Sequence, residues 1–274
     1  MCEALTFRRN SCDGARAAAP MKTVPGLAFS AGVFCGNRNQ IMNLEQLTAT
    51  VLACKKCPRL VRWREGVAKD PPRRYAGMRY WAKPLGGFGD PSARLLIVGL
   101  APAAHGGNRT GRMFTGDRSG DWLYGALHSY GFASQPNSEN RHDGLKLKDC
   151  FITAAVRCAP PDNKPTIAEF KRCRGYLVEE LRLFNRVRAV MVLGKIAFDS
   201  FFAAYGESGG VIPKPRPKFG HGAYFVLPDG LQLICSYHPS QQNTFTGKLT
   251  RPMFHQVFAR ARDILSGARD EQEE

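Results

Sequence analysis

The stretch that decides the fold is Leu95-Leu96-Ile97-Val98-Gly99, five residues without a polar side chain, followed at once by a loop of small residues. A run this short and this continuously apolar is typical of a strand buried on both faces of a sheet. Three further runs of the same kind lie at residues 151–156, 189–193 and 231–235. Together the four runs predict a central four-stranded sheet.

Helical patterns alternate with or follow these runs, at residues 121–130, 166–184, 195–205 and 252–265. The second begins with Thr166-Ile167-Ala168-Glu169, a capping box whose side chains satisfy the first backbone N–H groups of a helix. Asn43 and Gln46 form a similar signal where the folded region begins. Apolar strands alternating with helices predict an α/β domain with three layers, α/β/α, around a mostly parallel sheet.

A turn signal, Pro228-Asp229-Gly230, stands between residues 224–227 and the fourth apolar run and predicts an antiparallel hairpin at the edge of the sheet. Outside the periodic region, residues 1–42 are expected to form a flexible extension and residues 267–274 a disordered tail. The folded domain is therefore predicted to cover residues 43–266.

The composition restricts the class of partner. The chain has 274 residues, of which 43% are hydrophobic, and 39 Lys and Arg against 23 Asp and Glu give a net charge of +16. This charge favours nucleic acid as the partner, although a protein that is merely basic would look the same. No apolar run approaches the ~20 residues that cross a bilayer, and the chain does not open with a signal segment. We therefore expect a cytoplasmic protein with no membrane partner.

In a parallel α/β sheet, ligands bind beyond the carboxyl ends of the strands. Two loops at this predicted rim are distinctive: residues 99–121 read GLAPAAHGGNRTGRMFTGDRSGD, and residues 238–250 read HPSQQNTFTGKLT. Small residues permit a close approach to the backbone, Arg109 and Arg112 are candidates to hold phosphates, and Phe114 offers a ring for stacking a base. The alternative interpretation is a glycine-rich surface loop with one buried Phe.

Cysteines give a second signal. Cys54 and Cys57 form a C-x-x-C, and Cys158 and Cys173 form a widely spaced second pair. In a reducing compartment such a set points to a metal or cluster before a disulfide. Four thiolates satisfy a 4Fe–4S cluster or a structural zinc, and this spacing differs from the zinc ribbon, where both pairs are tight. Four unrelated buried cysteines are the alternative.

The two motifs resemble those of the type-five uracil-DNA glycosylases. Cys54, Cys57, Cys158 and Cys173 are similar to the cluster ligands shared by the type-four and type-five iron–sulphur enzymes, and the resemblance spans about residues 43–265. It implies a three-layer α/β/α domain with one structural 4Fe–4S cluster. It further implies base excision repair by a monofunctional glycosylase, which hydrolyses the N-glycosidic bond of uracil in DNA and leaves an abasic site.

Two departures from the wider family agree with the type-five group. The start of the first motif, Gly99-Leu100-Ala101-Pro102, lacks the carboxylate with which many uracil-DNA glycosylases orient water. Ala154, with Thr153 beside it, stands where type-four enzymes place an Asn that reads uracil. Without that Asn a wrong base leaves fewer buried polar groups unpaired, so discrimination relaxes. We therefore expect hypoxanthine, xanthine or etheno adducts as substrates besides uracil.

A glycosylase must swing its target nucleotide out of the duplex. The predicted base-binding positions are Gly99, Ala101, Ala103, Phe114 and His238. His238 is expected to stabilise the departing base anion by a hydrogen bond, and Asn108 to position the attacking water. Asp117 and Asp121 are alternatives for the water, although both also suit a helix cap. The first motif contains no lysine, so neither a Schiff base nor strand cleavage is expected.

The predicted DNA contacts are Arg109, Arg112, Ser240, Gln241, Asn243 and Lys248. Phe245 or Leu249 is the candidate wedge that enters the duplex. The expected partner is double-stranded DNA with a damaged base, or alternatively single-stranded DNA, bound by a monomer. Two other functions stay open at this point. One is a non-catalytic, four-cysteine metal protein that binds DNA; the other is an α/β enzyme acting on nucleotides or phosphate esters, which leaves the cysteines and the charge unexplained.

Overall fold

The computed structural model describes residues 42–267. The predicted extension (1–42) and tail (267–274) lie almost entirely outside the described residues. Within the described part, no helix is both long and apolar enough to cross a membrane.

The sheet has six strands in the described part of the chain, in the order β1-β3-β2-β4-β6-β5. They are β1 (Phe88–Gly89), β2 (Leu95–Gly99), β3 (Cys150–Ala154), β4 (Ala189–Leu193), β5 (Tyr224–Val226) and β6 (Gln232–Ser236). The four inner strands run parallel, and β1 and β5 pair antiparallel at the two edges. The mostly parallel sheet of four central strands and the edge hairpin are confirmed, and the sheet has one further edge strand, β1.

The strand that the sequence pattern did not reveal is β1, which is only two residues long. Glycines in and beside it allow a close approach to β3. A Cβ atom on Gly89 would lie 2.3 Å from the carbonyl oxygen of Cys150, and one on Gly87 would lie 2.2 Å from the ring of Phe151. Such a short, glycine-rich edge strand has no apolar alternation by which a sequence pattern identifies it.

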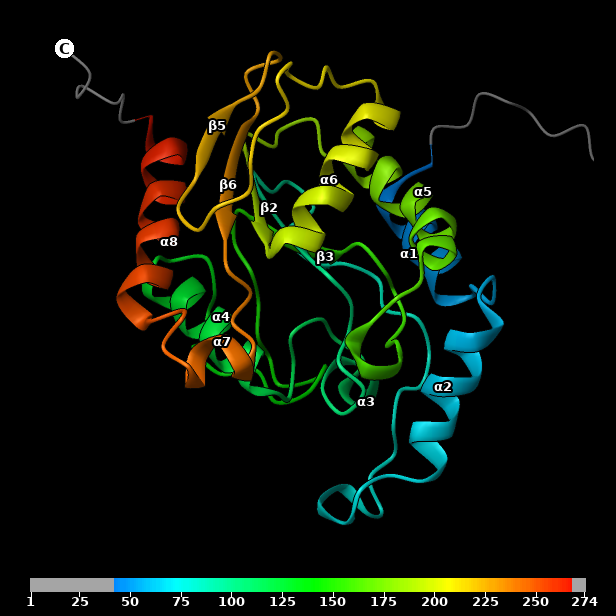
Figure 1. Ribbon diagram of the computed structural model, residues 1–274. Helices are drawn as coiled ribbons and strands as arrows, with labels where there is room; N and C mark the ends of the chain where they lie inside the picture. The colour runs from blue at the N-terminus through cyan, green and yellow to red at the C-terminus, as the bar shows by residue number, and fades with distance from the viewer. Residues whose placement is uncertain (1–41, 268–274) are drawn as a thin grey trace, which may run out of the picture. The chain divides into compact units, whose positions relative to one another are not determined.

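Helices cover both faces of the sheet (Figure 1). On one face lie α4 (Arg118–Ser129) and α8 (Arg251–Ser266), and on the other lie α5 (Ile167–Leu183) and α6 (Lys195–Ser208). Along β2, Leu95 and Ile97 pack towards α4 and α8, whereas Leu96 and Val98 pack towards α5 and α6. Burial on both faces is the reason why the inner strands are continuously apolar. The predicted three layers are confirmed.

A third, smaller apolar cluster joins α1 (Leu44–Leu52) and α2 (Pro58–Lys69) to α5. Both predicted capping boxes are present, with Asn43 capping α1 and Thr166 capping α5. The loops carry the short elements η1 (Arg73–Tyr75), α3 (Gly107–Thr110), η2 (Pro161–Asn163) and α7 (Gln241–Phe245).

A buried ion pair ties β3 and the loop after it to α5. Arg157 is 1% exposed and Glu180 2%, and a carboxylate oxygen of Glu180 accepts hydrogen bonds from the Arg157 guanidinium and from the hydroxyl of Thr153. A charge this deeply buried is costly if it loses its partner.

Replacing Glu180 by Gln should therefore destabilise the fold strongly. Breaking a buried pair costs about 3 kcal/mol or more, which for a domain of this size lowers the thermal midpoint by roughly 6 °C or more. Differential scanning calorimetry measures the shift. Glu207→Gln is the control, because it breaks the surface ion pair between Glu207 and Arg174. The Glu207 side chain is 53% exposed, so loss of this pair should change the stability little. Equal shifts in the two variants would contradict the structural role given to the buried pair.

Candidate active site and cysteine pocket

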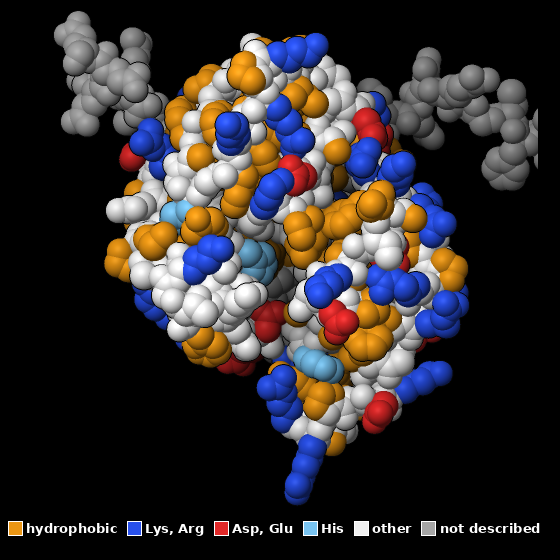
Figure 2. Space-filling view, viewed as in Figure 1, with side chains coloured by type: hydrophobic (Ala, Val, Ile, Leu, Met, Phe, Trp, Pro, Cys, Tyr) orange, Lys and Arg blue, Asp and Glu red, His pale blue; other side chains and the backbone are white. Residues whose placement is uncertain are grey.

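The loops that carry the two sequence motifs meet at one end of the parallel strands, beyond the carboxyl ends of β2, β3, β4 and β6. Figure 2 shows a hollow in the surface on the side of the molecule that includes these strand ends. A histidine side chain lies at its border, with lysine and arginine side chains around it. This is the rim at which parallel α/β sheets bind ligands.

Phe114 and His238 stack on each other at this rim. Their ring centroids lie 5.8 Å apart, with an interplanar angle of 30°. Phe114 comes from the loop after β2 and His238 from the loop after β6, so the fold brings together the two motifs that are far apart in the sequence. Two of the predicted base-binding residues are thus neighbours.

Glycines make room for this pair. A Cβ atom on Gly99 would lie 2.8 Å from the ring of Phe114, and one on Gly120 would lie 1.9 Å from its carbonyl oxygen. Phe114 itself has a φ of +51°, a left-handed conformation that is unfavourable for a bulky residue. The surrounding structure imposes this conformation, as is common at ligand sites.

The environment of His238 fixes its charge state. Burial lowers the pKa of His238 to about 4. Its carbonyl oxygen accepts a hydrogen bond from the side-chain amide of Asn243 at 2.8 Å. Neither imidazole nitrogen has a hydrogen-bond partner among the described residues. At neutral pH the ring is therefore uncharged and has one N–H free to donate to a ligand.

Asp117 is the carboxylate of the first motif loop. It caps α4, since an oxygen of its carboxylate accepts the backbone N–H of Gly120 at 3.0 Å. The capping role foreseen in the sequence is thus present. The side chain also lies against Gly106, where a Cβ atom would be 2.0 Å from its other oxygen. Burial raises the pKa of Asp117, yet the residue keeps some exposure.

Asn108 lies elsewhere than the sequence prediction requires. It is 0% exposed, and its amide nitrogen donates to the backbone oxygen of Arg64 at 3.2 Å. Its amide oxygen has no hydrogen-bond partner in the described part of the chain. Because the side chain reaches no solvent, this geometry does not support Asn108 as the residue that positions water, and it favours the partly exposed Asp117.

Arg112 also differs from its predicted role. It is 5% exposed, and its guanidinium donates to Asp143 at 2.8 Å, to Ser138 at 2.7 Å and to Thr115 at 3.0 Å. Arg112 holds the pKa of the Asp143 carboxyl well below its usual range, although burial alone would raise it. Because its donors are used inside the protein, this geometry does not support the predicted contact of Arg112 with DNA.

The other predicted DNA contacts lie around the rim. Gln241 and Lys248 are exposed, whereas Ser240 caps α7 and Asn243 supports the backbone of His238. Arg109 is partly exposed and fixed by donation to two backbone oxygens, those of His105 at 2.8 Å and Gly116 at 3.0 Å.

The two wedge candidates differ in exposure. Phe245 is 66% exposed and Leu249 is 1% exposed. Only Phe245 can therefore enter a duplex without unfolding its own surroundings. The guanidinium of Arg118 lies 4.3 Å from the centre of its ring.

The remaining predicted positions form the floor of the rim. Ala101 and Ala103 are partly exposed in the loop after β2, beside the buried Gly99. At the end of β3, Ala154 is buried and the hydroxyl of Thr153 is bound to Glu180. No side-chain amide therefore stands at this end of β3 to read a base.

The four motif cysteines line one pocket, at the junction of α1, α2, α5 and the loop after β3: Cys54, Cys57, Cys158 and Cys173. All four are free thiols. Burial raises the pKa of Cys158 to about 11 and that of Cys173 to about 12, so neither ionises at neutral pH without a bound cation.

The spread of these thiols bears on what they can hold. Zinc needs four ligands within about 2.3 Å of one point. Among the described residues, no three Cys, His, Asp or Glu side chains converge closely enough to hold a single metal ion. The four cysteines nevertheless share one pocket and can supply the thiolates of a metal centre.

A buried cation beside the cysteines supports this reading. Arg64 is 3% exposed, its guanidinium donates to the sulfur of Cys158 at 3.0 Å, and its Nε has no partner in the described structure. The nearest carboxylate is the half-exposed Glu65, 3.9 Å away. The backbone N–H of Arg157 also points at the sulfur of Cys173, at 3.3 Å. Such donors suit an anionic group with thiolate ligands.

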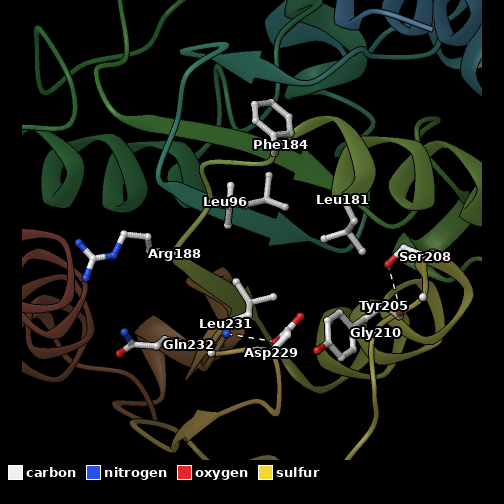
Figure 3. Close-up of a pocket in the computed structure, with 13 residues that line it drawn as sticks. Leu96, Leu181, Phe184, Arg188, Tyr205, Ser208, Gly210, Asp229, Leu231 and Gln232 are labelled. Carbon is white, nitrogen blue, oxygen red and sulfur yellow. Dashed lines mark hydrogen bonds between the residues drawn. The ribbon is translucent and has the colours of Figure 1, made fainter. Parts of the chain in front are cut away.

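A separate pocket of about 520 Å³ lies at the opposite end of the strands, next to the amino ends of β2 and β6 (Figure 3). Leu96, Leu181 and Phe184 form its apolar wall, and Tyr205 and Asp229 lie across from them. Neither sequence motif contributes to its lining, so it is distinct from the candidate active site.

Comparison with known proteins connects this geometry to a family. The family model for the uracil DNA glycosylase superfamily matches residues 87–262. The chain belongs to the uracil DNA glycosylase superfamily. Its members are glycosylases, so the protein is an enzyme that hydrolyses N-glycosidic bonds.

Individual relatives agree with the type-five resemblance. The chain is 49% identical to the Type-5 uracil-DNA glycosylase of Thermus thermophilus, over 81% of this chain and 99% of the relative. It is 47% identical to that of Mycobacterium bovis, over 87% of this chain and 84% of the relative, and 44% identical to that of Pyrobaculum aerophilum, over 76% and 87%.

The stack of Phe114 on His238 has a measurable consequence. Histidine-selective NMR titration should give a pKa of about 4 for His238, against about 6.5 for an unperturbed imidazole. Phe114→Ala removes the ring that shields the imidazole, so the pKa should rise towards the ordinary value. A pKa near 6.5 for His238 in the unaltered protein would contradict its burial.

Proposed function

We propose that this protein releases uracil from DNA by hydrolysis and leaves an abasic site without cutting the backbone. The observation that carries the proposal is the neutral His238, stacked on Phe114 at the rim with an unpartnered imidazole N–H. A flipped base can stack beside the Phe114 ring, and a donor in a water-poor site stabilises the negative charge that develops on its carbonyl oxygen.

The reaction needs a water as well as a leaving group. The N-glycosidic bond breaks, its electron pair leaves with the base, and the water oxygen bonds to C1′ of the sugar. Asp117 supports this step better than Asn108, because its carboxylate is partly exposed in the first motif loop. It can accept the proton that the water loses. The loop contains no lysine, which supports a monofunctional reaction.

The substrate range is proposed to extend beyond uracil to hypoxanthine, xanthine and etheno adducts. The end of β3 carries Ala154 and a Thr153 whose hydroxyl is already bound to Glu180. A base other than uracil therefore leaves no buried amide unpaired there, and rejection is weak.

The partner is proposed to be duplex DNA, bound by a monomer, with the cytoplasm and its chromosomal DNA as the setting. The exposed Phe245 supports duplex binding, since an apolar wedge can fill the gap left by the extruded nucleotide. Exposed Lys248 and Gln241 lie on the same segment and are the proposed contacts to the backbone.

The decisive experiment is base release from a labelled duplex with one uracil opposite guanine. The strand should break only after alkali, which reveals an abasic site. Breakage without alkali would contradict the monofunctional reaction. Binding without release would instead support a DNA-binding protein that is not catalytic.

Two substitutions test the proposed roles. His238→Ala should lower the single-turnover rate by about 100-fold or more, since one such donor contributes ~3 kcal/mol. Asp117→Asn should lower it by a similar order, because loss of a general base costs roughly 10²- to 10⁴-fold. His128→Ala, a histidine change on the exposed part of α4, is the matched control and should leave the rate unchanged. Full activity of His238→Ala would remove the imidazole from the mechanism.

We also propose that Cys54, Cys57, Cys158 and Cys173 hold a 4Fe–4S cluster. Their shared pocket and the buried Arg64 beside Cys158 support it. When bound, the cluster would supply four covalent ties between α1, α2, α5 and the loop after β3, and no redox step is assigned to it. Arg64 would compensate part of its negative charge.

Arg64→Met tests this assignment without reference to activity. The purified unaltered protein should be brown and contain about four iron atoms. In the variant, loss of a donor to a ligand should speed the bleaching of visible absorbance by a chelator about tenfold. Arg62→Met, on the exposed side of α2, is the control. A colourless protein with one zinc would overturn the cluster, and equal bleaching of both variants would remove the role of Arg64.

A further inference from the structure

Residues 70–83, here called the arm, connect α2 to the rest of the fold and extend beyond α2 and α3 as the cyan segment of Figure 1. The arm carries four cations and one carboxylate, Asp70. Its residue Met78 is 49% exposed, and Arg73, Arg74, Arg79 and Lys83 are exposed as well. Figure 2 shows lysine and arginine side chains on this lower end of the molecule, next to the hollow.

The arm is docked on the first motif loop by aromatic residues. The hydroxyl of Tyr80 and Nδ1 of His105 are hydrogen-bonded at 2.9 Å, and the backbone N–H of Trp81 donates to the carbonyl oxygen of Arg109 at 3.0 Å. The ring of Tyr75 stacks on His105, with centroids 5.7 Å apart. The position of the arm relative to the catalytic rim is therefore fixed by the loop that carries Phe114 and Asp117.

The same aromatic rings hold cations. The guanidinium carbons of Arg109 and Arg74 lie 4.5 Å and 4.8 Å from the centre of the Tyr75 ring. That of Arg141 lies 4.3 Å from the centre of the Trp81 ring. Cation–π contacts orient guanidinium groups without neutralising them.

These cations lack carboxylate partners. In the described part of the chain, no ion pair is made by Arg73, Arg74, Arg79, Lys83, Arg109 or Arg141. Burial and the charges of Arg74 and Arg109 lower the pKa of His105, which reports a positive potential at the place where the arm meets the motif loop. Six unpaired cations in one region repel one another unless an external anion lies among them.

We propose that the arm is a second DNA-binding surface. It holds the backbone phosphates of the duplex that flanks the flipped nucleotide on the arm side of the hollow. This inference rests on the proposed glycosylase function. A polyanion with regularly spaced charges satisfies several separated cations at once, which an isolated phosphate or carboxylate cannot do. Continuity with the catalytic loop selects DNA over an acidic peptide. The arm reads no base; it fixes register and adds affinity.

The test uses the full-length protein and a duplex containing a non-hydrolysable 2′-fluoro-deoxyuridine opposite guanine. Arg73→Ala/Arg79→Ala removes two exposed cations of the arm. Binding should weaken about tenfold at low salt, and the slope of log affinity against log salt should become shallower by about 1.8, or two phosphate contacts. Arg186→Ala/Lys148→Ala, which removes two exposed cations near the amino ends of β4 and β3, is the charge-matched control and should change neither quantity.

A charge-neutral variant separates the arm from net charge. Tyr75→Leu removes the ring on which Arg74 and Arg109 are mounted, and it should also weaken binding and flatten the salt slope. Duplexes shortened from one side of the uracil should locate the contact: removal of flanking DNA on one side should abolish the difference between the unaltered protein and the Arg73/Arg79 variant.

The outcomes are distinguishable from a failure of the proposed function. Uracil release by the unaltered protein is measured beside binding, because it tests the glycosylase function without reference to the arm. Absence of release by the unaltered protein would sink the glycosylase proposal whatever the arm does. The arm proposal would be overturned by unchanged affinity and salt slope in the arm variants. Equal losses in the Arg186/Lys148 control would overturn it too, as would tighter binding of poly-glutamate than of DNA.

Discussion

Burial of four parallel strands on both faces is the constraint on which the rest of the structure depends. It makes β2 and β4 apolar throughout and leaves few polar side chains in β3 and β6, such as Thr153, whose hydroxyl is bound to the buried Glu180. Polar and functional groups are therefore displaced to the ends of the strands. The parallel order then brings the loops after β2 and β6 together, which is why two motifs more than a hundred residues apart in the sequence share one stack of rings.

Buried cations give this rim its rigidity. Arg112, Arg157 and Arg64 are each at most 5% exposed, and each joins segments that are distant in the sequence. Arg112 and Arg157 have carboxylate partners, whereas Arg64 has the sulfur of Cys158. An arginine this deep without a strong carboxylate partner requires another anion nearby. The backbone oxygen of Arg64 also accepts a hydrogen bond from the side-chain amide of Asn108. Arg64 therefore connects the cysteine pocket to the first motif loop.

The sequence was sufficient for features that depend on periodicity and local chemistry. The four inner strands, the layers, the edge hairpin and the caps Asn43 and Thr166 all follow from patterns of a few residues, and the structure contains them. It was insufficient where a side chain has two plausible environments. Arg112 and Arg109 look alike in the motif, but only the structure shows that Asp143 faces Arg112. The structure likewise does not support Asn108 as the residue that positions water, because its side chain is buried and bound to the backbone oxygen of Arg64 in α2. No sequence pattern in residues 70–83 predicted the arm, because its aromatic residues hold it in place through contacts with a distant loop, such as those of Tyr75 and Tyr80 with His105.

The charge state of His238 determines which chemical strategy the site can use. A positively charged imidazole would attract the base anion most strongly, but burial against Phe114 makes that form unfavourable and leaves a neutral donor. The first motif also lacks a carboxylate at its start, and the carboxylate that the motif loop does contain, that of Asp117, lies further along as the cap of α4. Many Lys and Arg side chains lie instead on the surface, where under the proposed function they would bind phosphates and offset the cost of extruding a nucleotide. Under the proposed function, catalysis by such a site would depend on positioning and on DNA binding as well as on the Asp117 base. A lesion that is already weakly paired therefore benefits most, since less of the binding free energy is consumed in opening the duplex.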